Sequence, residues 1–120
     1  MKDIHEIARH KRHRRFTLRI KGSRERPRLV VHRSLKNLSL QCIDDAAGKT
    51  LFSLTTLDKE MKAQCVSAGN VLASAAFGEL AARRIKEKGI TKIILDRAGY
   101  LYHGRIKAFA EGLRKGGLDF

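Results

Sequence analysis

The chain has 120 residues, about the size of one ordinary domain, and 42% of them are hydrophobic, which is enough for a modest core. Twenty-six lysines and arginines face twelve aspartates and glutamates, a formal net charge of +14 at pH 7. Because such an excess repels itself in a compact chain, it predicts a polyanionic partner. No apolar run approaches the ~20 residues of a membrane span, and the N-terminus lacks the apolar segment of a signal peptide. We therefore expect a cytoplasmic protein without a membrane partner.

The positive charge is concentrated near the N-terminus. Residues 1–36 hold half of the basic residues but only three acids, so this segment carries +10 and the remaining 84 residues carry +4. A uniformly basic, solvated surface would spread the charge evenly. The asymmetry instead predicts a basic arm over residues 1–27 and a globular domain over residues 28–120.

The arm gives two conflicting periodicities. Ile4 and Ile7 lie at helical spacing, whereas Phe16, Leu18 and Ile20 alternate with polar residues as in a strand. Like charges packed this densely also destabilise an isolated helix. We expect an arm that is mobile by itself and becomes ordered on its partner.

Three short strands are predicted after Pro27, over residues 29–32, 38–42 and 50–55. Alternation of apolar and polar residues in the second strand indicates one buried face. Residues 44–49 are rich in turn formers and predict a hairpin loop. The three strands should form an antiparallel meander whose other face is solvated or contacts a partner.

The second half predicts two helices and one more strand. A helix over 70–88 ends at Gly89, and its small residues would let it lie close against a sheet. The apolar run 90–95 is typical of an interior strand, parallel to the strand before the helix. A last helix covers 104–115. The predicted fold class is α/β, with a small mixed sheet (an antiparallel meander plus one parallel strand) packed by two helices.

Neither the cysteines nor the histidines indicate a metal site. Cys42 lies in an alternating apolar run and reads as a buried thiol, and Cys65 forms no paired motif with it. His5, His10 and His13 have no cysteine or carboxylate at ligand spacing and lie among cations that oppose a metal dication. We expect no metal and no other cofactor.

Catalysis has weak support in the sequence. Asp44 and Asp45 precede Ala-Ala-Gly in a hairpin loop, where turn geometry alone favours aspartate. Asp96 and His103 flank the end of a predicted strand, which leaves a small phosphoryl-processing enzyme as an alternative. No nucleophile motif or glycine-rich phosphate loop accompanies them. We expect no catalytic residue and no small-molecule substrate.

RNA binding explains more of the pattern. Ten basic residues and one acid lie between Arg9 and Arg28, and the planar fork of arginine engages phosphate with two hydrogen bonds. The segment 96–105 adds two of the seven aromatic residues to arginine and histidine in a glycine-flanked loop. Such side chains stack on unpaired bases, although the tyrosines could equally cap the edge of the sheet.

Three sequence blocks resemble one family. They are DRAGYLYHGR at 96–105, RPRLVVHRSLK at 26–36 and GGLDF at 116–120. Together they are similar to large-subunit ribosomal protein eighteen of the bacterial type, and the similarity extends over essentially the whole chain. The resemblance implies a structural, non-catalytic protein that binds 5S rRNA and helps attach it in the central protuberance. Its implied partners are 5S rRNA, large-subunit rRNA and neighbouring ribosomal proteins. A basic RNA-binding protein outside the ribosome is the alternative.

The resemblance places RNA contacts on the arm, the first strand with its turn, and the loop over residues 96–105, called the aromatic loop below. The expected RNA-binding residues are Arg9, Lys11, Arg12, Arg14, Arg15, Arg19, Lys21, Arg26, Arg28, Arg33, Ser34, Lys36, Tyr100, Tyr102, His103 and Arg105. The chain departs from the family at Asn37 and Ser39, where histidine and an aromatic residue are frequent, and at Ala98, where glycine is common. These departures weaken the case for base stacking on the sheet and for a close backbone approach at Ala98.

Overall fold

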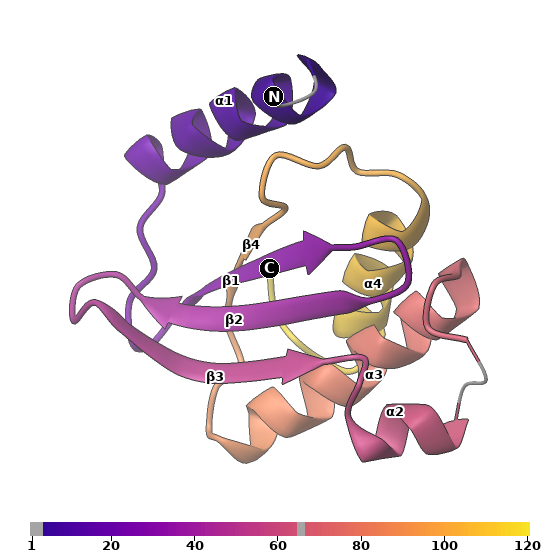
Figure 1. Ribbon diagram of the computed structural model, residues 1–120. Helices are drawn as coiled ribbons and strands as arrows, with labels where there is room; N and C mark the ends of the chain where they lie inside the picture. The colour runs from indigo at the N-terminus through magenta and orange to yellow at the C-terminus, as the bar shows by residue number, and fades with distance from the viewer. Residues whose placement is uncertain (1–3, 65–66) are drawn as a thin grey trace.

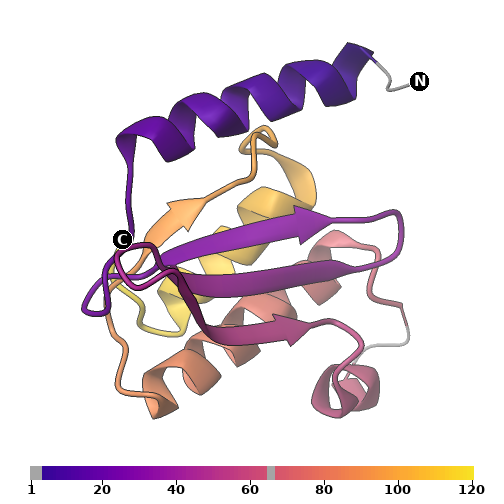
Figure 2. The same ribbon diagram turned by 60° about the vertical axis from the view of Figure 1, so that its left-hand side comes forward.

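The computed structural model describes residues 4–64 and 67–120 as a small α/β fold (Figure 1). The elements in chain order are α1 (Ile4–Arg19), β1 (Arg28–Arg33), β2 (Leu38–Asp44), β3 (Lys49–Thr55), α2 (Lys59–Gln64), α3 (Val71–Glu87), β4 (Ile94–Asp96) and α4 (Gly104–Lys115). The strands form one sheet in the order β3-β2-β1-β4. Helices α3 and α4 cover one face of the sheet, whereas α1 lies beyond the edge formed by β4 (Figures 1 and 2).

The antiparallel meander is confirmed. β1 pairs with β2 and β2 with β3, both antiparallel, and alternate residues of β2 point into the core. Leu40 and Cys42 belong to this buried set, and burial raises the pKa of the Cys42 thiol to about 12. The expectation of a buried core thiol at Cys42 is therefore confirmed. Cys65 lies outside the described residues.

The fourth strand is shorter and lies elsewhere than predicted. β4 covers only Ile94–Asp96 and pairs in parallel with β1, at the edge of the sheet that the described residues form. The preceding residues pair with the C-terminal segment, because Ile93 N donates to Asp119 O (3.0 Å) and Asp119 N donates to Thr91 O (2.9 Å). The apolar run therefore does not mark an interior strand. Ile93 is fully buried because it packs in the core cluster beside the helices.

Helices α3 and α4 pack against each other through small residues. An added Cβ at Gly78 of α3 would lie 2.3 Å from Phe109 O, and one at Gly112 of α4 would lie 2.3 Å from Ala75 O. The ring of Phe77, the residue before Gly78, stacks on that of Phe109 with centroids 5.5 Å apart. The small residues of α3 thus serve the contact with α4 rather than the close approach to the sheet that the sequence suggested.

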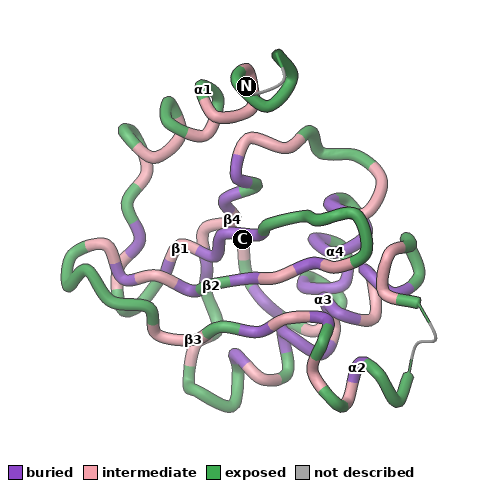
Figure 3. The backbone as a smooth tube through the Cα atoms, viewed as in Figure 1, coloured by how far each residue is buried: buried purple, intermediate pink, exposed green. Residues whose placement is uncertain are grey.

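The arm is a helix, so the helical periodicity holds rather than the alternation of a strand, and its mobility in the free protein stays a prediction. α1 runs over sixteen residues, and none of its residues is buried (Figure 3). Its polar contacts with the body replace the apolar packing that usually stabilises a surface helix. The segment that follows is fixed to the β2–β3 hairpin, since Gly22 O accepts a hydrogen bond from Asp45 N (3.1 Å). The division of the chain at residue 27 stays a prediction.

The Gly78–Gly112 contact predicts that one added methyl group lowers the stability of the fold. We expect Gly78→Ala to lower the free energy of unfolding by about 1–3 kcal/mol, because the backbone of α4 must move to admit the Cβ. Urea denaturation measures this change. Glu87→Ala, at an exposed position of the same helix, is the control and should change stability little. Equal stability of Gly78→Ala and the native chain would contradict the tight helix contact.

Candidate nucleic-acid interface

Helix α1 is docked on a tight turn of the loop that follows β4. Arg9 Nη1 donates to Ala98 O (2.9 Å), and Arg12 Nε donates to Gly99 O (2.9 Å). Both acceptor residues have positive φ, 53° at Ala98 and 81° at Gly99. A Cβ at Gly99 would lie 2.1 Å from Arg9 O, so the backbones of α1 and the loop touch there. The close approach therefore occurs at the glycine that the chain retains, next to Ala98.

A buried carboxylate joins the arm to the sheet. Asp96 is 1% exposed, and its Oδ2 accepts from His13 Nε2 (2.8 Å) and from Arg28 Nη1 (2.7 Å). The same Arg28 guanidinium binds both oxygens of Asp45, at 3.0 Å each, and Asp45 Oδ2 also accepts from Gly22 N. The hydrogen bonds to Asp45, together with the one to Asp96, raise the pKa of Arg28 against the effect of burial, and the guanidinium in turn lowers the pKa of Asp45.

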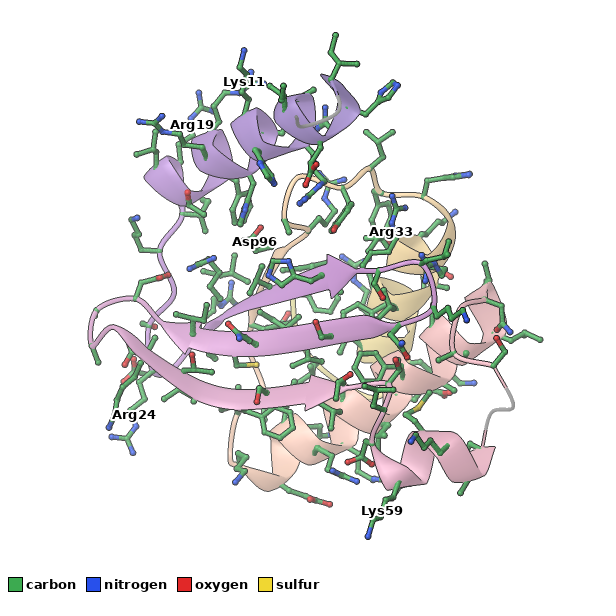
Figure 4. The ribbon with its side chains drawn as sticks, in the orientation of Figure 1. Lys11, Arg19, Arg24, Arg33, Lys59 and Asp96 are labelled. Carbon is green, nitrogen blue, oxygen red and sulfur yellow. The ribbon has the colours of Figure 1, made fainter. Side chains whose placement is uncertain are left out.

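The opposite face of α1 is a row of free cations. Lys11, Arg14, Arg15 and Arg19 are exposed, and the ion pairs found among the described residues involve none of them. Lys11 and Arg19 point away from the sheet in Figure 4. Lys21 is exposed just beyond the helix. The predicted arm residues therefore divide into an inner set that holds the body and an outer set that faces solvent.

The fold brings the β1–β2 turn next to the aromatic loop. Arg105 Nη2 donates to Ser34 O (2.8 Å), and the Tyr100 hydroxyl donates to Arg33 O (3.1 Å) while accepting from Arg33 N (3.3 Å). The guanidiniums of Arg9 and Arg33 lie 4.4 and 4.8 Å from the centre of the Tyr100 ring. Tyr100 thus holds three segments of the protein together, which favours the structural interpretation for this residue.

Tyr102 lies in a different environment. Its side chain is 40% exposed, and the Arg97 guanidinium lies 5.9 Å from the ring centre. His103 is also exposed and precedes α4. Arg97 was not among the predicted RNA-binding residues, although it belongs to the same sequence block. In the structure Arg97 lies beside an exposed tyrosine, and an arginine and an aromatic ring can stack on one base together. Membership of that block is the sequence signal that could have identified Arg97.

Other predicted residues lie apart from these groups. Arg26 and Arg28 are at the opposite end of β1 from Arg33, where Arg26 forms an exposed ion pair with Asp119 (3.6 Å). The two carboxylates that hold Arg28 give it a role in the fold, and its contact with RNA stays a prediction. Lys36 is exposed in the β1–β2 turn beside Ser34.

The carboxylates considered for catalysis have structural partners. Asp44 Oδ1 accepts from Ala46 N (3.1 Å) and Ala47 N (3.3 Å), which confirms its assignment to turn geometry. Asp96 binds the arm, β1 and its own loop. Within residues 4–64 and 67–120, no group of three or more histidine, cysteine or acidic side chains could hold a metal ion. No helix in that same part of the chain is long and apolar enough to cross a membrane.

The chain is similar to known proteins over nearly its whole length. Residues 4–120 match the family model described as ribosomal L18 of archaea, bacteria, mitochondria and chloroplasts. The large ribosomal subunit protein uL18 of Pelotomaculum thermopropionicum is 54% identical over 112 residues, 93% of this chain and 92% of that one. The uL18 of Picosynechococcus is 48% identical over the full length of both chains, 120 residues.

The chain belongs to the ribosomal L18 family. It is a structural, non-enzymatic component of the large ribosomal subunit, and it works on the ribosome in the cytoplasm. The resemblance read from the three sequence blocks is thus confirmed. Family membership also decides against the phosphoryl-processing enzyme and against an RNA-binding protein outside the ribosome.

The Arg28–Asp45 pair predicts a dependence of stability on acid. An unfolded aspartate has a pKa of about 3.9, and Arg28 holds the folded value lower. The folded state therefore binds fewer protons, so the contribution of Asp45 is complete above pH ~4 and is lost as the pH falls through the folded pKa. We expect Asp45→Asn to be about 2 kcal/mol less stable near neutral pH and to lose part of this acid dependence.

Urea denaturation at several pH values tests this prediction. Glu111→Gln, at an exposed position of α4, is the control and should keep the acid dependence of the native chain. If the stability of Asp45→Asn falls with pH as steeply as that of the native chain, the Arg28–Asp45 pair contributes nothing to the acid dependence of stability.

Docking of the arm predicts that one substitution in the aromatic loop makes amide hydrogen exchange in α1 faster. Gly99→Ala adds a Cβ against Arg9 O at a residue with φ of 81°, and should weaken docking of α1 by about 1–3 kcal/mol. Amide hydrogen exchange should then become faster throughout Ile4–Arg19 and change little in α3 and α4. Gly48→Ala is the matched control, because Gly48 also has positive φ but nothing within 4 Å of an added Cβ. Unchanged exchange in α1 would contradict the docked arrangement.

Proposed function

We propose that the protein binds 5S rRNA in the large ribosomal subunit and helps attach it in the central protuberance, beside large-subunit rRNA and neighbouring ribosomal proteins. The observation that carries the proposal is the outer row of α1, formed by Lys11, Arg14, Arg15 and Arg19. These cations have no carboxylate partner among the described residues. A structured polyanion is the partner that such a row fits.

The docked arm supports a division of labour between affinity and selectivity. A sixteen-residue helix is about 24 Å long, so its outer row can follow several successive phosphates of a nucleic-acid backbone. Because the inner face already holds the body, α1 meets RNA in a fixed orientation. Contacts of this kind supply affinity that depends strongly on salt but carry little sequence information.

The body supplies the selective contacts in this proposal. Ser39 and Gln41 lie on the face of the sheet away from α3 and α4, and Tyr102, with Arg97 beside its ring, lies in the aromatic loop. Folded RNA is recognised largely by shape, by the 2′-hydroxyl and by stacking of unpaired bases. A small polar sheet face beside an exposed tyrosine suits these contacts. The aromatic contribution then comes from Tyr102 rather than from Tyr100, whose ring is engaged by two arginines.

Neutralising the outer row tests the proposal. The variant with glutamine at Lys11, Arg14, Arg15 and Arg19 should bind purified 5S rRNA at least about a hundredfold more weakly. The slope of log affinity against log salt concentration should become shallower by about 1 for each contact removed. A filter-binding or gel-shift titration at several salt concentrations gives both quantities, and α1 should remain docked because its inner face is intact.

The matched control removes four positive charges far from the arm. Lys59, Lys62, Lys88 and Lys92 are exposed, and Lys59 lies at the opposite end of the molecule from α1 (Figure 4). Their replacement by glutamine should leave affinity and salt slope nearly unchanged. Equal losses in the two variants would indicate attraction by net charge alone. Binding of tRNA as tight as that of 5S rRNA would refute selective recognition by the body.

A further inference from the structure

A cavity of about 520 Å³ lies between α1 and the start of α4. Its wall includes Arg9 and Arg12 from the arm, Arg33 from the end of β1, and Arg105 from the first turn of α4. Four arginines from three elements therefore line one space. The fold creates this cluster, because the arm must dock on the aromatic loop before its arginines face those of the body.

Positive charge in the cavity is poorly compensated. Among the described residues Glu6 is the one carboxylate on its wall, and the ion pairs found there include none of the four arginines. Burial, followed by the charge of Arg33, lowers the pKa of Arg105. Arg105 Nη1 is buried and has no hydrogen-bond partner among the described residues. Buried donors of a cation are normally satisfied, so this atom indicates a missing acceptor.

The start of α4 adds backbone donors to the same wall. Gly104 and Arg105 line the cavity and open a twelve-residue helix, and the side chain of His103 makes no capping hydrogen bond. The first amides of a helix have no acceptor within the helix, and they lie at the positive end of its dipole. Free amides beside arginine forks are the donor set that holds a phosphate group.

We propose that this cavity binds one phosphodiester group of the RNA backbone, held between the arm and the body. The proposal rests on the RNA-binding function proposed above and adds a specific subsite to it. A phosphate in this position would accept hydrogen bonds from both sides of the arm–body contact. RNA binding and docking of α1 would therefore strengthen each other, since each completes the site for the other.

Inorganic phosphate is the probe for the subsite itself. Titration of the full-length protein at constant ionic strength, followed by amide NMR, should shift the signals of Gly104, Arg105 and Ile106 in a saturable way. Arg33→Gln should weaken this binding about tenfold, because it removes a charged donor from the wall. Glu6→Gln should tighten it, because it removes the opposing carboxylate. Arg24→Gln is the charge-matched control at the far end of the molecule (Figure 4) and should leave the affinity unchanged.

The occupant is tested by competition. Saturation with 5S rRNA should abolish the phosphate-induced shifts of the α4 amides, and Arg33→Gln should make the salt slope of RNA binding shallower by about 1. Phosphate shifts that are not saturable, or that survive Arg33→Gln unchanged, would overturn the subsite. Persistence of phosphate binding in the RNA complex would overturn the phosphodiester as occupant. The proposed function fails separately, if the protein with its outer row intact shows no preference for 5S rRNA.

Discussion

The buried carboxylate of Asp96 is the point on which the arrangement of the molecule depends. A carboxylate that is 1% exposed is unfavourable unless charged or polar donors surround it. Its donors come from three places: His13 in the arm, Arg28 at the start of β1, and the Ala98 amide in its own loop. Because the three donors share one acceptor, the arm, the sheet and the aromatic loop are fixed relative to one another.

This constraint gives opposite tasks to cations that look alike in the sequence. Arg9 and Arg12 bind loop carbonyls, and Arg28 binds two carboxylates, so these arginines hold the protein together. One helical face away, Arg14 and Arg15 have solvent around them. A helix turns neighbouring residues to different sides, so a dense basic run in a helix both docks on its own body and presents charge outward. The same geometry creates the cationic cavity beside α4.

Local sequence patterns predicted the helices and strands well where residues nearby in the chain determine their structure. The helix α3 ends near Gly89 as expected, because a residue with φ of 82° terminates a helix wherever it stands. The meander follows from alternation in β2, which needs only one covered face. The sequence left the arm undecided between helix and strand, and the prediction of an interior strand over residues 90–95 was wrong. In both cases the deciding partners, the loop carbonyls and the C-terminal segment, are about ninety and twenty-five residues away in sequence.

By itself, the sequence determined the fold class, the excess of positive charge at the N-terminus and the ribosomal family. Composition, periodicity and short motifs carry that information without reference to distant contacts. Only the tertiary structure decided which arginines face solvent, that two guanidiniums contact the Tyr100 ring, and that four arginines from three elements line one cavity. The physical reason is that a side chain's partners depend on where the folded backbone places it, and β1, the loop and the arm meet only after the sheet and helices have formed.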